Sequence, residues 1–234
     1  RGPGGHASIP GKGTPLPRLG AFMCEVENTD LFPVRLSSAS AEMYRRMAAL
    51  SADEGERAYL TAIAEEHPGW QESLGERQKE MLGTTIAFTM AGGSQAANVI
   101  PQEAYVICNI RVAPGETVAG AVAALQAVAD RHQVELEVLR SNEPSPVTDP
   151  RGEAFVRVER AIQAAWPGTE VLPFLLSGGT DTKHFVSLCP NCLRFTAYWI
   201  SADQQVRCHA IDENIDLDTI PNGVDFFKNL IQGL

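Results

Sequence analysis

The sequence predicts a mixed α/β chain that begins with a split-βαβ, ferredoxin-like domain carrying a helical insert and continues into a second α/β portion. Hydrophobic and polar residues alternate along residues 86–90 and 104–112, as in half-buried strands, whereas apolar residues recur at helical spacing along 118–128. Residues 143–146 contain two prolines two positions apart, which neither a helix nor a strand can accommodate. The expected domains are therefore residues 1–143 and 144–234.

The first domain opens with a segment that is too rich in turn-forming residues for more than a short strand end. Residues 1–17 hold five Gly and four Pro. An amphipathic helix is predicted next, from the helical spacing of Leu19, Phe22, Met23 and Val26. Residues 30–83 show little alternation and are rich in Ala, Glu, Arg and Met, which indicates an inserted segment of several short helices. The expected interruptions are at Pro33, Gly55, Pro68, Gly69 and Gly75.

The rest of this domain is predicted to be two strands, a helix and a final strand. The first strand is residues 86–90 and the second is residues 104–112, which stops at Pro114-Gly115. Thr117 is the expected N-cap of the helix that follows. An alternating stretch at residues 134–138 predicts the last strand.

The second domain is predicted to contain a helix near residues 155–165, strands at 171–176 and 193–200, and a terminal helix capped near Asp218. The residues expected on the inward face of the terminal helix are Ile220, Val224, Phe227 and Ile231. About ninety residues with few strands would be only marginally stable alone, so we expect this portion to belong to a larger domain.

Composition excludes several classes of function. Acidic residues number 29 against 19 basic ones, and the formal net charge of −10 disfavours nucleic acids and anionic membranes as partners. No apolar run approaches the roughly 20 residues that a transmembrane helix needs. The odd number of cysteines, five, argues against a disulfide framework and favours a reducing compartment, so a cytoplasmic location is expected.

Two residues of the first domain are candidates for catalysis and substrate binding. Gly4-Gly5 precedes His6, so a ligand can approach the backbone closely and the imidazole can donate a hydrogen bond to a developing oxyanion. A simple turn histidine is the alternative. Arg111 lies on the polar face of a predicted strand, where its guanidinium can bind a carboxylate through two hydrogen bonds. An exposed arginine paired with a glutamate is the alternative.

Three further segments occur in the second domain. Residues 177–181, Ser-Gly-Gly-Thr-Asp, follow an apolar strand, which is where α/β proteins place ligand loops, although a plain turn is also possible. His209 is followed by Asp212 and Glu213, so it can ligate a metal while a carboxylate orients its ring, unless it is an ordinary surface histidine. Cys189 and Cys192 have the spacing of a redox motif, but the context is not thioredoxin-like and a second such pair for zinc is absent, so their role is interpreted as structural.

The order of the motifs resembles that of the dinuclear-zinc aminoacylase and carboxypeptidase family. The segments that carry the resemblance are GGHASIP (4–10), NVIP (98–101), NIRVAPGET (109–117), SGGTDTKHF (177–185) and CHAIDENI (208–215). The helical insert is most similar to that of the carboxypeptidase S branch, whose members act on peptides or N-acyl amino acids. The chain would then comprise the lid, or dimerisation, domain and the C-terminal part of the catalytic domain.

The resemblance implies a role for each candidate residue. His209 would be a zinc ligand, and His6 would steady the tetrahedral oxyanion, often across a homodimer. Asn98 would support the same oxyanion or the substrate backbone, and Arg111 would bind the free carboxylate of the substrate. The substrate pocket would be lined by Gly178, Gly179 and Thr180. The implied reaction is amide hydrolysis assisted by two zinc ions.

The sequence departs from the family pattern in one large respect. The family's other zinc ligands and its glutamate general base precede the lid, and this chain starts after them. His209 alone cannot hold two zinc ions, because catalytic zinc usually needs three protein ligands. The expectation is that this chain by itself retains no zinc, of which a complete active site would hold two ions, and is inactive. The alternatives are a non-catalytic dimerisation module, an RNA-recognition fold, which the sheet composition and charge disfavour, and a thiol redox protein.

Overall fold

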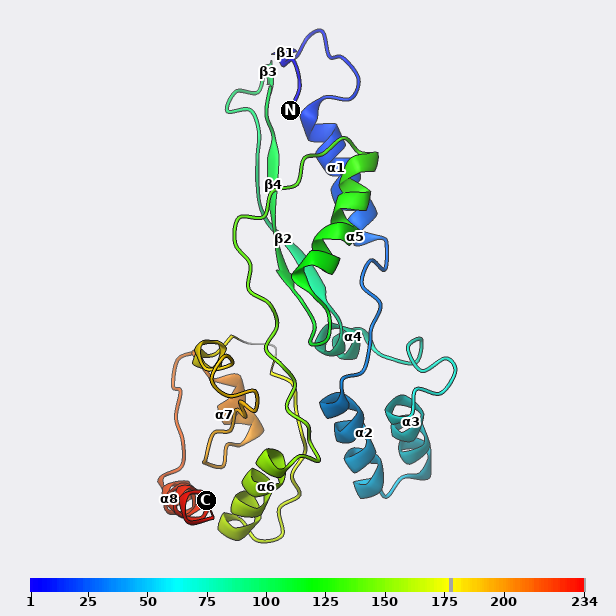
Figure 1. Ribbon diagram of the computed structural model, residues 1–234. Helices are drawn as coiled ribbons and strands as arrows, with labels where there is room; N and C mark the ends of the chain where they lie inside the picture. The colour runs from blue at the N-terminus through cyan, green and yellow to red at the C-terminus, as the bar shows by residue number, and fades with distance from the viewer. Residues whose placement is uncertain (177–178, 234) are drawn as a thin grey trace. The chain divides into compact units, whose positions relative to one another are not determined.

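The computed structural model describes residues 1–176 and 179–233, which divide into two compact units (Figure 1). The first unit comprises residues 1–35 and 69–145, and the second comprises residues 36–68 and those from 146 onward. The middle of the helical insert thus groups with the C-terminal portion. Helices and small antiparallel strand pairs coexist in the chain, which confirms the predicted mixed α/β class.

The strands of the first unit form two antiparallel pairs, β1 with β3 and β2 with β4. The register of the longer pair shifts between Phe88 and Met90, so the ribbon carries an irregularity there. The elements of this unit are β1 (Gly5–His6), α1 (Pro15–Glu27), α4 (Glu76–Leu82), β2 (Thr85–Gly92), β3 (Val99–Ile100), β4 (Tyr105–Arg111) and α5 (Val118–Arg131).

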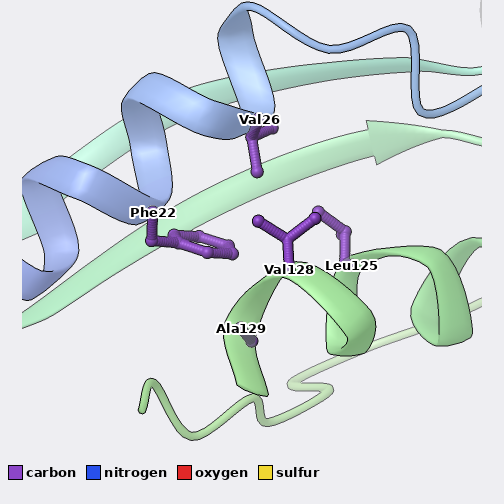
Figure 2. Close-up of a cluster of buried hydrophobic side chains, with 5 residues drawn as sticks. All are labelled: Phe22, Val26, Leu125, Val128 and Ala129. Carbon is purple, nitrogen blue, oxygen red and sulfur yellow. The ribbon is translucent and has the colours of Figure 1, made fainter. Parts of the chain in front are cut away.

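Helices α1 and α5 pack together beside the β2–β4 ribbon, and their apolar faces form the core of this unit (Figure 2). The ring of Phe22 meets the edge of Phe88 on β2 at a centroid distance of 6.1 Å. Burying one such large apolar side chain contributes about 1.5–3 kcal/mol. The buried members of the cluster are Phe22, Val26, Leu125, Val128 and Ala129.

Three expected strands are absent from the described residues: residues 134–138, 171–176 and 193–200 do not form strands. The alternation that predicted the first of them is nevertheless real, because Val134 and Leu136 pack against the core while Glu135 and Glu137 are exposed. The Val134 amide donates instead to the Ala129 carbonyl at the end of α5. A strand requires a hydrogen-bonded neighbour, and none of the described residues pairs with these three segments.

The second unit is built from helices and irregular segments in its described residues. Asp53 caps α3 by accepting from the Glu56 amide at 2.6 Å, so Gly55 lies in the first turn of a helix and does not interrupt one as expected. The described part of the chain contains no helix long and apolar enough to cross a membrane. The elements are α2 (Ser38–Leu50), α3 (Glu54–Ala64), α6 (Glu153–Ala165), η1 (Asp181–His184), α7 (Ala202–Val206), η2 (Leu217–Thr219) and α8 (Ile220–Gln232).

Helix α8 faces the core with different residues from those predicted. Phe226 is buried against α6 and lies 4.8 Å from the ring of Phe195, and Gly223 lies under the carbonyl oxygen of Ala197. The apolar residues of this helix spread over one broad face, so the predicted and the observed inward residues lie on adjacent parts of it, and the close approach at Gly223 selects one part. The residues expected inward are 44–65% exposed: Ile220, Val224, Phe227 and Ile231.

A polar contact joins α2 to α6 in the second unit. The Arg46 guanidinium donates to the Glu159 carboxylate and, at 2.8 Å, to the carbonyl oxygen of Val171. It also lies 5.5 Å from the centre of the Phe155 ring. One arginine therefore links the insert to two segments of the C-terminal portion.

Candidate functional site

His6 and Asn98 come from distant parts of the sequence and meet at the β1–β3 pair. The Cα of His6 pairs with that of Val99, and the Ala7 amide donates to the Asn98 carbonyl oxygen at 3.0 Å. Both side chains are exposed. The structure therefore brings together two of the residues that the sequence predicted to act on the same oxyanion.

The glycine before this strand is required by the close approach of two backbones. Gly4 has a φ of +70°, which side-chain-bearing residues rarely adopt. A Cβ at Gly4 would lie 2.7 Å from Cγ of Gln102 and 3.2 Å from the carbonyl oxygen of Ile100. The glycine thus lets β1 reach β3 and places His6 at the strand end.

The ring of His6 is oriented by Ser8, a residue that the sequence reasoning did not single out. The Ser8 amide donates to Nδ1 of His6 at 3.2 Å, and the Ser8 hydroxyl lies 2.8 Å from the same atom. Because Nδ1 accepts a hydrogen bond, the neutral ring carries its proton on Nε2. In the described part of the chain Nε2 has no protein partner, so it is free to donate to a ligand.

Arg111 lies away from His6 within the same unit. Arg111 is the last residue of β4 and pairs with Thr85, at the end of the β2–β4 ribbon next to α4. His6 lies on β1, and α4 and β1 occupy opposite ends of this unit (Figure 1). The side chain of Arg111 is exposed, and among residues 1–176 and 179–233 it forms no ion pair. The alternative of an arginine paired with a glutamate is therefore not observed.

The predicted pocket loop is only partly described, because Ser177 and Gly178 lie outside the described residues. A Cβ at Gly179 would meet nothing within 4 Å, so the loop surface is open there. The Thr180 hydroxyl caps η1 by accepting from the Thr182 amide at 3.4 Å, and it also accepts from Nε of Arg194 at 3.0 Å. Thr180 is thus held by two donors.

His209 lies on an exposed loop after α7, beside two further groups that can bind a metal. One donor atom from each of Cys208, His209 and Glu213 lies within 4.8 Å of the others, and all three residues are exposed. Nitrogen, sulfur and carboxylate oxygen are the donors that zinc prefers, so this set fits the ion. Sequence reasoning gave a carboxylate such as Glu213 only the role of orienting the His209 ring and gave Cys208 no role, although the adjacent Cys-His pair with a glutamate four positions after His209 was the available signal.

The candidate residues are distributed over both units. His6, Asn98 and Arg111 belong to the first unit, whereas Thr180 and His209 belong to the second.

Comparison with known proteins gives a consistent result. The model of the peptidase dimerisation domain, M20_dimer, matches residues 1–137. The "Probable carboxypeptidase S-like 2" of Dictyostelium discoideum is 30% identical over 150 residues, which cover 64% of this chain and 29% of that protein. The "N-fatty-acyl-amino acid synthase/hydrolase PM20D1" of Homo sapiens is 26% identical over 238 residues, which cover 97% of this chain and 46% of that protein.

A solved structure shares the fold. The M20 family metallo-carboxypeptidase Sso-CP2 from Sulfolobus solfataricus aligns with a TM-score of 0.59 at 14% identity, covering 97% of this chain and 54% of that one. The chain therefore spans about half, or less, of the length of these proteins.

Proposed function

We propose, from the premise that this chain belongs to the M20 peptidases through their dimerisation domain, that the whole protein hydrolyses an amide bond in a peptide or an N-acyl amino acid with the help of a metal. The names of its relatives support this reaction class, since they include a carboxypeptidase S-like protein and an N-fatty-acyl-amino acid synthase/hydrolase. The observation that carries the proposal is the meeting of the His6 and Asn98 segments at β1–β3, where His6 pairs with Val99 and the Ala7 amide donates to the Asn98 carbonyl oxygen, with Nε2 of His6 free to donate.

In this proposal His6 stabilises the negative charge that develops on the amide oxygen. A donor aimed at an oxyanion contributes about 10²–10³ in kcat. The Asn98 carboxamide, which is exposed beside His6, supports the same oxyanion or the substrate backbone. A homodimer formed through this domain would allow His6 of one protomer to act at its partner's site.

The remaining candidates bind the substrate and the metal. Arg111 binds the free carboxylate of the substrate, and Gly179 and Thr180 line the pocket. His209 would hold zinc, which when bound would supply a water of lowered pKa and polarise the amide carbonyl. Because the dinuclear centre needs further ligands and a general base, we expect the 234-residue chain alone to be inactive.

The test compares the whole protein with this chain on N-acyl amino acids and dipeptides, with and without zinc. We expect zinc-dependent hydrolysis by the whole protein and none by the chain. His6→Ala in the whole protein should lower kcat about 100-fold or more with little change in KM. His67→Ala is the matched control, because His67 is also exposed and pairs with Glu65.

An inactive whole protein that still dimerises through residues 1–137 would refute the proposal and favour the dimerisation module. Hydrolysis by the isolated chain would show that it holds a complete site.

A further inference from the structure

We propose that Cys189 and Cys192 form a reversible disulfide by exchange with a low-molecular-weight disulfide of the glutathione class. Their Cys-Pro-Asn-Cys segment follows η1 and precedes residues 193–200 in the second unit. The proposed hydrolase function uses neither thiol, and the exchange requires neither a substrate nor a metal. The inference is therefore independent of that function.

The exposure of the two thiols suits them to different steps of the exchange. Both cysteines are free, Cys189 being exposed and Cys192 half-buried. An incoming disulfide must reach the attacking sulfur, whereas the resolving sulfur has only to reach its neighbour. Cys189 therefore fits the role of the attacking residue, and Cys192 fits that of the resolving residue.

Both thiols lie against the backbone of the same short segment. The Cys192 thiol donates to the carbonyl oxygen of Cys189 at 3.2 Å, and the Cys189 thiol donates to the carbonyl oxygen of Asn191 at 3.5 Å. The chain bends at Pro190 between them, and the proline ring fixes one backbone angle there. Because a thiol is a weak donor, both hydrogen bonds are readily exchanged for a disulfide. Each sulfur thus already contacts the other cysteine or its immediate neighbour.

The chain is held by hydrogen bonds on both sides of the pair. Before it, the carbonyl oxygen of Phe185 accepts from the amides of Leu188 and Cys189, both at 2.9 Å. After it, Nε of Arg194 donates to the Thr180 hydroxyl at 3.0 Å. A segment held at both ends samples fewer conformations than a free one, so closing the disulfide ring costs less conformational entropy and one thiol has a higher effective concentration at the other.

The exchange takes place in two steps. The Cys189 thiolate attacks one sulfur of oxidised glutathione, so a mixed disulfide forms and one glutathione leaves as a thiolate that takes up a proton. The Cys192 thiolate then attacks the Cys189 sulfur, so the Cys189–Cys192 bond forms, the mixed disulfide breaks and the second glutathione leaves in the same way. The pair loses two electrons and two protons, and the two glutathione molecules gain them.

The other three cysteines are expected to behave differently. Cys24 and Cys208 are exposed, but neither has a second cysteine within three positions along the chain, so each should stop at a mixed disulfide. Burial raises the pKa of the half-buried Cys108 thiol. A raised pKa leaves less of the reactive thiolate, so Cys108 should react slowly.

The test equilibrates the 234-residue chain with oxidised glutathione, quenches it with acid, alkylates the remaining thiols and identifies tryptic peptides by mass spectrometry. Trypsin cleaves after Lys183 and Arg194, so residues 184–194 form one peptide that contains Cys189, Cys192 and no other cysteine. We expect this peptide to lose both alkylation sites and to become two hydrogens lighter, and dithiothreitol should reverse the change. Cys192→Ser should instead accumulate one glutathione on Cys189.

The double variant Cys24→Ser/Cys208→Ser is the matched control, because it removes the two other exposed thiols and should still form the internal disulfide. Circular dichroism verifies that each variant is folded. If both thiols of the wild-type peptide remained open to alkylation, the proposal would be overturned. A mixed disulfide that persisted on the wild-type peptide would also overturn it, because Cys192 would then not reach Cys189.

The order of attack is tested by the rate at which glutathione adds to each single variant. Addition should be faster in Cys192→Ser, which retains the exposed thiol, than in Cys189→Ser, which retains the half-buried one. The reverse order would overturn the assignment of the two roles. Because no substrate is present, none of these outcomes depends on whether the whole protein is a hydrolase.

Discussion

Replacing Glu42 with Gln should weaken the network that holds α2 in the second unit. The Glu42 carboxylate accepts hydrogen bonds from Arg45 at 2.6 Å, Arg46 at 3.1 Å and Arg151 at 3.0 Å. Its side chain is only 11% exposed. Glutamine has nearly the same shape but removes the charge and one acceptor oxygen, so it leaves the arginines without a full partner.

The size of the effect follows from the exposure of the three arginines. The Arg46 side chain is 25% exposed, against 45% for Arg45 and 66% for Arg151. A hydrogen bond to a charged group contributes about 1.5–3 kcal/mol, whereas an exposed ion pair contributes about 0–1 kcal/mol. Since glutamine retains one acceptor, we expect a loss of about 1–3 kcal/mol in the free energy of unfolding.

The contribution of Glu42 should also depend on pH. Partial burial acts to raise the pKa of Glu42, but hydrogen bonds from Arg46, Arg151 and Arg45 outweigh it, so the pKa lies below its ordinary value. A carboxylate with a lowered pKa stabilises the fold above its unfolded pKa, and this stability is lost as the pH falls through the folded pKa. Glu42→Gln should therefore lose less stability on acidification than the wild type.

The assay is urea unfolding followed by far-ultraviolet circular dichroism, at neutral pH and at about pH 3. Glu153→Gln is the matched control, because its side chain is 86% exposed and pairs with Arg157 at i,i+4. It should change the free energy of unfolding by no more than about 0.5 kcal/mol. Equal losses in the two variants at neutral pH would refute the reasoning.

Three further predictions follow from packing and from the proposed site. Gly223→Ala would place a Cβ 2.2 Å from the carbonyl oxygen of Ala197, so thermal unfolding should show a loss of about 1–3 kcal/mol in the free energy of unfolding. Gly20→Ala in α1 is the control: its Cβ would meet nothing within 4 Å, so the variant should be more stable by about 0.5–1 kcal/mol. Leu125→Ala should cost about 2–5 kcal/mol in urea unfolding, because Leu125 is 1% exposed in the core of the first unit. In the whole protein, Arg111→Ala should raise KM for substrates with a free carboxylate far more than for their esters, and equal changes would contradict a carboxylate-binding role.

Local sequence was sufficient where a structural element depends on nearby residues. Helix α5 begins where Thr117 predicted, because the Thr117 hydroxyl accepts from the Gly120 amide at 3.0 Å within the same turn. The alternation along β2 and β4 identified both strands, which pair with each other in antiparallel fashion. The order of the motifs also predicted the M20 family, and the match to the dimerisation domain over residues 1–137 confirms it.

The candidate site was predictable only in part. The glycines before His6 indicated a strand end, but the orientation of its ring by Ser8 required the three-dimensional turn. Likewise, Cys208 and Glu213 lie close to His209 because His209 and Asp212 adopt left-handed backbone conformations. A hydrophobic pattern does not reveal such conformations.

By itself, the sequence determined helices α1, α5, α6 and α8, the existence of strands β2 and β4, and the family. Only the tertiary structure decided that residues 134–138 form no strand, that Phe226 rather than Phe227 enters the core, and that the middle of the insert joins the C-terminal portion. The spacing of apolar residues along the chain indicates which side chains avoid water. Strand pairing and the inward face of a helix depend also on a partner surface elsewhere in the chain, and that surface exists only once the chain has folded.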